Sequence, residues 1–204
     1  MQNPPVGAWT TCVFLLLFGV PSAGGDQIPG VSEFPRSKAR VIKGGAFSLT
    51  DHLGRNVADS DFQGEFLLIY FGYTHCPDVC PAALSVMHRA IDLLGDDGIK
   101  VQPLFVTFDP VRDTVERVAD YVTNFHPRLI GLTGSREQTL AAAEHYGVDV
   151  SATYKAEQPG SAYSMNHSAF TYLVGPTGRL KVMFRDGTDA PLMAGTIRRH
   201  LGAR

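Results

Sequence analysis

Two cysteines are the residues of this sequence best suited to chemistry. Cys76 and Cys80 stand in the segment YTHCPDVCP, residues 73–81, with three residues between them. On a helical backbone that spacing brings both sulfurs to one face, about one turn apart. Two thiolates placed in this way can close a disulfide or bind one soft metal ion. Thiolates select Cu(I), zinc or iron–sulfur units over magnesium or calcium, and a third, imidazole ligand would also suit Cu(II).

The dithiol falls where an apolar strand, residues 66–71, gives way to a helix over residues 82–94. The unpaired amides and the dipole of a helix start favour thiolate over thiol, so we expect a lowered cysteine pKa. Pro77 suits a first helical turn, whereas Pro81 is expected to distort the turn that follows. Thiol–disulfide exchange usually uses two intervening residues, so the third residue here favours metal binding. The alternatives are a redox dithiol, a pair of small buried apolar residues, and an incidental disulfide.

A third metal ligand must come from elsewhere, and the chain has seven histidines. His75 directly precedes the first cysteine, but at a strand end it points to the opposite side, so we expect a supporting or surface role. His52 lies in a turn. His167 leads directly into the strand over residues 169–174, and in a thioredoxin-like sheet that entry lies beside the dithiol. Its position makes it a candidate ligand, with a satisfied polar residue as the alternative. The other four histidines are expected within helices or at their ends, in solvated positions: His88, His126, His145 and His200.

The remaining elements follow from hydrophobic periodicity and from two expected capping boxes, residues 113–116 (DTVE), capped by Asp113, and residues 135–138 (SREQ), capped by Ser135. Strands are expected over residues 45–50, 66–71, 101–108, 129–132, 169–174 and 180–184, and helices over 82–94, 113–125, 135–146 and 189–201. The near-continuous apolar run at 66–71 predicts a central strand covered on both faces. Alternating strands and helices, closed by a hairpin at residues 175–178, predict an α/β fold. Its central mixed β-sheet is flanked by helices and extended by an N-terminal β-hairpin.

The N-terminal part of the chain reads as an export segment followed by a tether. Residues 1–25 contain no acidic or basic residue and include the apolar run of residues 12–20, which has the form of a signal-peptide core. That run is shorter than the roughly 20 residues of a spanning helix, so a membrane anchor is the second interpretation. Residues 26–40 read as a linker and residues 41–204 as the domain. A net charge of -2 gives no reason to expect nucleic acid as a partner.

Five segments, in order, resemble the SCO/SenC family. They are residues 70–81 (YFGYTHCPDVCP), 108–114 (FDPVRDT), 131–134 (GLTG), 167–170 (HSAF) and 175–178 (GPTG). The resemblance extends from about residue 45 to the C-terminal helix. It implies a thioredoxin-like fold whose two cysteines and histidine bind one copper ion, either Cu(I) or Cu(II).

Carried over by motif, Cys76 and Cys80 are the thiolate ligands and His167 is the imidazole ligand. Asp109 is expected near the site without binding the metal. Asn166 stands where the family commonly has Asp, which removes a charge beside the histidine. The implied partners are the copper-bearing subunit of cytochrome c oxidase and a thioredoxin-like reductant. The implied location is the periplasm or the outer face of the inner membrane.

Two functions follow from these expectations. The first is a metallochaperone that loads copper on Cys76, Cys80 and His167 and passes it to the oxidase subunit by ligand exchange. The second is a thiol–disulfide reductase that keeps the cysteines of that subunit reduced. Whether the protein is an enzyme depends on which of the two is correct, and they need not exclude each other. A peroxiredoxin-type activity is disfavoured because Cys80 is misplaced as a resolving cysteine.

Overall fold

The described residues are built around one mixed β-sheet. The computed structural model describes residues 31–32, 44–148 and 170–202. Within them lie eight strands in the order β1-β8-β7-β4-β5-β6-β2-β3. Their bounds are β1 Val31–Ser32, β2 Ser48–Asp51, β3 Asn56–Ala58, β4 Phe66–Gly72, β5 Val101–Thr107, β6 Ile130–Thr133, β7 Phe170–Val174 and β8 Leu180–Arg185.

The pairing directions confirm the expected mixed sheet. Strands β4, β5 and β6 run parallel, whereas β7 pairs antiparallel with β4 and forms a hairpin with β8. The predicted N-terminal hairpin is β2 and β3, which joins the sheet through antiparallel pairing of β2 with β6. At the other edge β1 pairs with β8, so the predicted linker of residues 26–40 contains one short strand.

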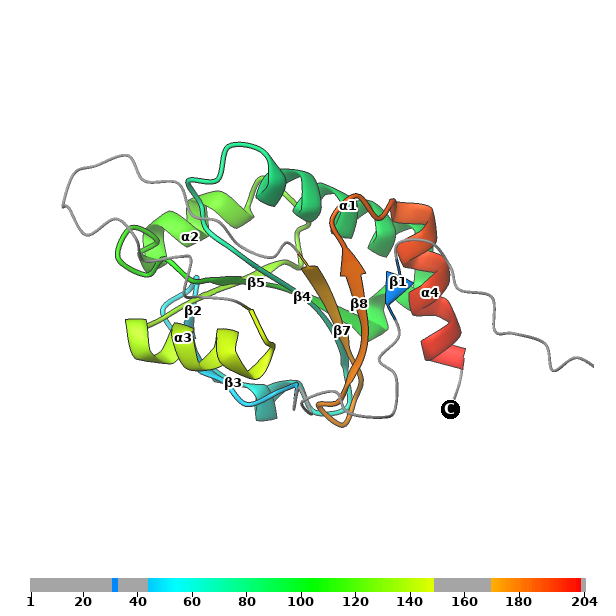
Figure 1. Cartoon of the computed structure of the whole chain (residues 1–204), viewed down its shortest axis with the longest axis horizontal. Helices are drawn as coiled ribbons and strands as arrows, with labels where there is room; N and C mark the ends of the chain where they lie inside the picture. Colours follow the sequence, from blue (N-terminus) through cyan, green and yellow to red (C-terminus); the bar gives the residue numbers. More distant parts are fainter. Residues whose placement is uncertain (1–30, 33–43, 149–169, 203–204) are drawn as a thin grey trace, which may run out of the picture.

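Within the described ranges, four α-helices cover this sheet. They are α1 Val79–Leu94, α2 Val115–Val122, α3 Arg136–His145 and α4 Ala190–Gly202, with 3₁₀ turns η1 Asp59–Phe62 and η2 Gly95–Lys100. Figure 1 shows α1 and α2 on one side of the sheet, α3 on the other, and α4 beside α1. The connections from β4 to β5 and from β5 to β6 step in the same direction across the sheet. Because connections between parallel strands are right-handed, both place their helices, α1 and α2, on the same face.

The centre of the molecule is the strand from which the dithiol loop leaves. All seven residues of β4 are buried, as expected for a strand covered on both faces. Helix α1 presents a buried stripe to it with the helical spacing of three and four residues: Cys80, Leu84, Met87, Ala90, Ile91 and Leu94. Gly95 ends this helix with a φ of 60°, a conformation that glycine adopts without steric cost.

One of the two predicted capping boxes is confirmed and the other is wrong. Ser135 caps α3, accepting from the Gln138 amide at 3.3 Å while its own amide donates to Gln138 Oε1 at 2.8 Å. At α2, however, the cap is Thr114, whose hydroxyl accepts from the Arg117 amide. Asp113, expected as the capping residue, instead turns its carboxylate into the protein interior, where it is fully buried.

The predicted export segment, residues 1–25, lies outside the described residues. Among the residues that the structure does describe, no helix is both long enough and apolar enough to cross a bilayer.

Candidate metal centre

The two cysteines meet at the start of α1, but not as predicted. We expected both on one helical turn; the structure places Cys80 second in α1 and Cys76 in the preceding loop. A turn closed by the Cys76 amide donating to the Tyr73 carbonyl at 3.2 Å folds this loop over the helix start. The Cys80 amide then donates to Cys76 Sγ at 3.4 Å. Neither thiol takes part in a disulfide.

The sulfur of Cys76 occupies a role that a capping side chain usually takes. Asp78 holds the cap position of α1, yet its carboxylate accepts no capping hydrogen bond. The first amides of a helix have no partner within the helix, and here one of them is paired with sulfur. A sulfur in this position lies at the positive end of the helix dipole, which suits an electron-rich metal ligand.

Of the two early prolines, Pro77 lies in the loop before α1 and not in its first turn as expected, whereas Pro81 fits inside the helix start. Pro81 was expected to disturb the helix, and this prediction is wrong because Pro81 is the third residue of α1. The amides of a first turn need no helical acceptor, so a residue without an N–H is tolerated there. The regular ladder begins with the next residue, where the Ala82 amide donates to the Asp78 carbonyl at 3.1 Å.

The two sulfurs sit in different surroundings. Cys80 is completely buried, whereas Cys76 is half-buried at the surface. Burial raises the pKa of the Cys80 thiol well above its ordinary value, although a backbone hydrogen bond from Tyr73 opposes the shift. The lowered pKa expected from the helix start is therefore wrong for Cys80, because desolvation of a buried thiolate outweighs the local amides. Cys76 is therefore the more accessible of the two sulfurs.

Gly72 makes room for the buried sulfur. A Cβ at this position would lie 2.9 Å from Cys80 Sγ and 3.0 Å from the rings of Tyr70 and Phe105. Real side-chain carbons do not approach neighbours this closely, so the last residue of β4 must lack a side chain for Cys80 to sit against the strand. Sequence reasoning missed this role, because a glycine after an apolar run reads only as the end of a strand.

We expect Gly72→Ala to displace the Cys80 sulfur and to lower the free energy of unfolding by about 1–3 kcal/mol, the usual cost of overpacking a core. Denaturant unfolding with both thiols reduced measures this. Gly195→Ala is the matched control, because a Cβ added to Gly195 in α4 would have no neighbouring atom within 4 Å, so alanine there should stabilise by up to about 1 kcal/mol. Equal stability of wild type and Gly72→Ala would contradict the close contact.

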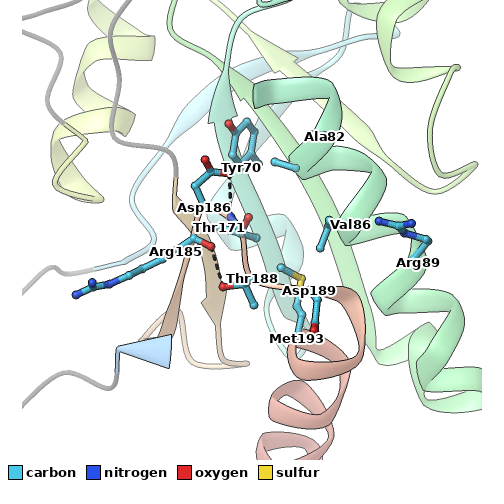
Figure 2. Close-up of a pocket in the computed structure, with 12 residues that line it drawn as sticks. Tyr70, Ala82, Val86, Arg89, Thr171, Arg185, Asp186, Thr188, Asp189 and Met193 are labelled. Carbon is cyan, nitrogen blue, oxygen red and sulfur yellow. Dashed lines mark hydrogen bonds between the residues drawn. The ribbon is translucent and has the colours of Figure 1, made fainter. Parts of the chain in front are cut away.

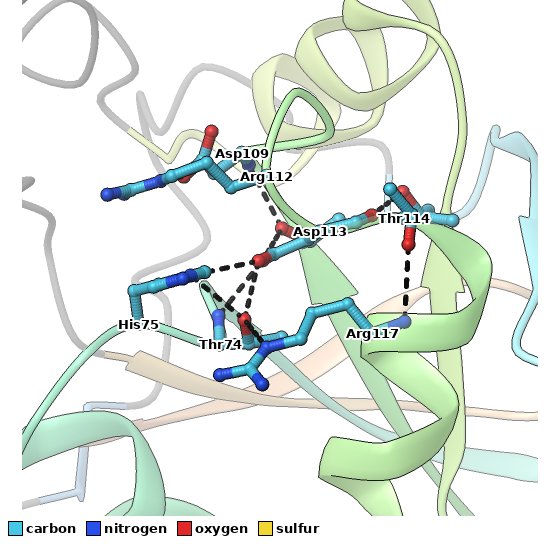
Figure 3. Close-up of polar contacts among 9 residues, drawn as sticks. Thr74, His75, Asp109, Arg112, Asp113, Thr114 and Arg117 are labelled. Atoms are coloured by element: carbon cyan, nitrogen blue, oxygen red, sulfur yellow. Dashed lines mark hydrogen bonds and ion pairs between the residues drawn. The ribbon is translucent and has the colours of Figure 1, made fainter. Parts of the chain in front are cut away.

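A buried carboxylate anchors the loop that carries Cys76. Asp113 Oδ2 accepts from the Thr74 amide at 2.9 Å and from the Thr107 hydroxyl at 2.6 Å, and Oδ1 accepts from the Thr74 hydroxyl at 2.6 Å. The Asp113 carbonyl accepts from the Thr133 hydroxyl at 2.8 Å. Asp113 thus joins the dithiol loop to the ends of β5 and β6. Figure 3 shows its contacts with Thr74.

Two further side chains, His75 and Arg117, extend this anchor. His75 Nδ1 lies 3.2 Å from the Thr74 hydroxyl and 3.6 Å from Asp113 Oδ1, as Figure 3 shows. Arg117 Nε donates to the same hydroxyl at 3.2 Å from α2. His75 therefore points toward the carboxylate and supports the loop, in agreement with the supporting role expected for it.

Asp109 reaches the dithiol loop through a neighbour. It is buried and pairs with Arg112, whose guanidinium lies over the Tyr73 ring, 5.6 Å from its centroid. Tyr73 belongs to the loop that carries Cys76. The expectation that Asp109 lies near the site as a non-ligand remains a prediction.

The predicted third ligand, His167, and the neighbouring Asn166 lie outside the described residues. In the parts of the chain that the structure covers, no group of three or more His, Cys, Asp or Glu could hold a metal ion. Several other histidines have structural partners there: His52 accepts from the Gly131 amide, His88 pairs with Asp92, His126 accepts from the Arg128 amide, and His145 contacts the Ala46 carbonyl.

Comparison with known proteins gives one consistent family. Residues 35–202 match the family model described as SCO1/SenC. The chain is 44% identical over 161 residues to the mitochondrial SCO2 homolog of Bos taurus, covering 78% of this chain and 60% of the relative. It is 38% identical over 194 residues to the mitochondrial SCO1 homolog of Homo sapiens, covering 87% and 63%. The chain thus spans about three fifths of the curated relatives it matches.

Solved structures agree with this result. Arabidopsis thaliana ScoI with copper bound has a TM-score of 0.72 and 36% identity, covering 79% of this chain and 99% of that one. Yeast Sco1 with copper bound has a TM-score of 0.73 and 34% identity, covering 79% and 89%. The thioredoxin-like fold expected from the sequence is confirmed by these neighbours.

Proposed function

The chain belongs to the SCO1/SenC family, and on this premise we propose that it is a copper metallochaperone. Its task is to assist assembly of the copper centre of cytochrome c oxidase. One observation carries the proposal: the hydrogen bond from the Cys80 amide to Cys76 Sγ, which holds two cysteines that are not joined by a disulfide close together at a helix start. Related Arabidopsis and yeast structures with copper bound support copper as the metal.

The proposed ligands are Cys76, Cys80 and His167. Two thiolates and one imidazole suit copper in both oxidation states, because thiolate is the soft ligand that Cu(I) prefers and imidazole also binds Cu(II). The half-buried Cys76 is the sulfur at which copper enters and leaves, and the buried Cys80 holds it against the core. The donor set therefore combines an accessible ligand with a fixed one.

Transfer follows from this asymmetry. A thiolate of the recipient subunit displaces Cys76 first, since Cys76 is the exposed ligand, and the copper ion then moves by successive ligand exchange without a change of oxidation state. If the dithiol is oxidised, a thioredoxin-like partner supplies two electrons and two protons to reopen the disulfide before copper binds. We place these steps outside the reducing cytosol, in the periplasm or on the outer face of the inner membrane.

His167 separates this function from thiol–disulfide reduction. We expect His167→Ala to weaken Cu(II) binding by more than the roughly 10–100-fold that loss of a supporting residue costs at a metal site. Titration with Cu(II) followed by absorption measures the affinity. His88→Ala is the matched control, because His88 is a partly exposed histidine of α1 paired with Asp92.

The cellular outcome decides between the two candidate functions. A metallochaperone requires that His167→Ala also impair assembly of the oxidase copper centre. Normal assembly with His167→Ala, together with failure of assembly with Cys76→Ala, would favour the reductase that needs only the dithiol. Failure of the reduced wild-type protein to bind about one equivalent of copper would end the metallochaperone proposal outright.

A further inference from the structure

The buried sulfur of the dithiol is touched by a phenol hydroxyl. Tyr70 projects from β4 and its hydroxyl donates to Cys80 Sγ at 3.8 Å, with both residues almost completely buried. Figure 2 shows Tyr70 close to Ala82 at the N-terminal end of α1, on the wall of a cavity of about 260 Å³. In the sequence Tyr70 reads only as one residue of an apolar core strand.

The Tyr70 hydroxyl is a side-chain donor to the dithiol, so a substitution can remove it without changing the backbone. Cys76 Sγ accepts from the Cys80 amide, and Cys80 Sγ also accepts a backbone hydrogen bond from Tyr73. Backbone donors are common to any sequence that adopts this loop. The Tyr70 hydroxyl, by contrast, depends on the residue type at this position of β4. It donates to Cys80, the buried sulfur that the recipient does not reach first.

We propose that Tyr70 is a positioning residue that sets the reduction potential of the dithiol, and of copper bound to it, through its hydrogen bond to Cys80 Sγ. The copper half of this proposal rests on the proposed function, whereas the dithiol half does not.

The direction of the effect follows from the chemistry of sulfur. A thiol or thiolate sulfur is a better hydrogen-bond acceptor than a disulfide sulfur, so the Tyr70 hydroxyl stabilises the reduced dithiol relative to the disulfide. When sulfur binds copper, a hydrogen bond withdraws electron density from it and weakens its donation to the metal. Hydrogen bonding around a cysteine sulfur is an established means of tuning copper potentials, and weaker donation favours Cu(I) over Cu(II).

Tyr121 offers a matched comparison. Its hydroxyl is buried, has no hydrogen-bond partner among the described residues, and lies near enough to both cysteines for their charges to contribute to its raised pKa, after the larger effect of burial. Tyr121→Phe therefore deletes a buried hydroxyl near the dithiol without deleting a hydrogen bond to sulfur. Tyr70→Phe deletes both the hydroxyl and the hydrogen bond, and each variant keeps its aromatic ring.

The first experiment equilibrates each protein with reduced and oxidised dithiothreitol, which passes two electrons and two protons to the disulfide as its own dithiol is oxidised. We expect Tyr70→Phe to shift the equilibrium about tenfold toward the disulfide, or about 30 mV more negative for this two-electron couple. Tyr121→Phe should leave it unchanged. An unchanged Tyr70→Phe, or equal shifts in both variants, would overturn the proposal.

The second experiment loads the same proteins with Cu(II) and records the sulfur-to-copper charge-transfer absorption. Loss of the hydrogen bond should move this band to lower energy in Tyr70→Phe and leave it in place in Tyr121→Phe. If the wild-type protein binds no copper, the proposed function is refuted. The dithiothreitol equilibrium then still tests whether Tyr70 sets the reduction potential of the dithiol. A wild-type protein that binds copper, with no band shift in Tyr70→Phe, would refute the copper half of the inference alone.

Folding is checked by thermal unfolding of each variant. Should Tyr70→Phe fail to fold, the infrared difference spectrum between reduced and oxidised wild-type protein tests the same bond, because the tyrosine C–O stretching band responds to hydrogen-bond donation. A tyrosine band that shifts on reduction supports the proposal, and a spectrum without one contradicts it.

Discussion

Replacing either Cys76 or Cys80 by alanine is expected to lower the affinity for Cu(I) at least ~1,000-fold, or about 4 kcal/mol. Each substitution removes one of the two proposed thiolate ligands, and the chain's remaining cysteine, Cys12, belongs to the predicted export segment. Competition with a Cu(I) chelator of known affinity measures the loss. Cys12→Ala is the matched control and should bind copper as the wild type does.

The two cysteine variants should differ in stability even though both lose copper. Cys80 is completely buried against Gly72 and Tyr70, so alanine there removes core contacts and leaves a small cavity, at a cost of about 1 kcal/mol. Cys76 is half-buried, and its loss should cost less. Retention of tight Cu(I) binding by either variant would show that the two sulfurs do not form one site.

Asp113→Ala is expected to destabilise the protein by about 3–5 kcal/mol, the largest effect on stability that the site predicts. The substitution leaves the Thr74 amide and two threonine hydroxyls without their acceptor in a buried position. These groups lose hydrogen bonds to a charged acceptor and cannot regain them from water. Denaturant unfolding measures the change, and copper affinity should also fall because the loop that holds Cys76 is released.

Asp113→Asn tests whether the hydrogen bonds themselves are responsible. An asparagine oxygen in the place of Oδ2 still accepts from the Thr74 amide and the Thr107 hydroxyl, so we expect a smaller loss of about 1–2 kcal/mol. Thr114→Ala is a useful control for the neighbouring position, since it removes only the cap of α2 and should cost about 1 kcal/mol. Equal stability of Asp113→Ala and wild type would contradict an anchoring role.

Periodicity along the chain predicted most of the fold. The helix predicted over residues 82–94 is observed as α1, which begins three residues earlier. The strand predicted over residues 66–71 is observed as β4, which ends one residue later. Such elements are readable because each depends on neighbours a few positions away: apolar spacing in α1, and the capping box at Ser135. The order of strands and helices then restricted the topology, because crossovers between parallel strands are short and right-handed.

Residue type and spacing also identified the two thiols, and the ordered motifs identified the family. What local pattern could not supply was the environment of each thiol. The lowered pKa expected at a helix start is wrong for Cys80 because the fold buries this thiol against β4, and desolvation depends on everything that surrounds a group.

The tertiary structure decided how the site is held. Asp113 carries the sequence signature of a helix cap, yet it bonds Thr74, a residue 39 positions earlier in the chain. Tyr70 reads as core, yet it donates to a sulfur ten positions later. Gly72 reads as a strand end, yet it is the space into which Cys80 fits. The sequence by itself determined which atoms could bind a metal. The packing of distant segments determined which sulfur is exposed, which is buried, and what holds them together, because such contacts form only when the chain is folded.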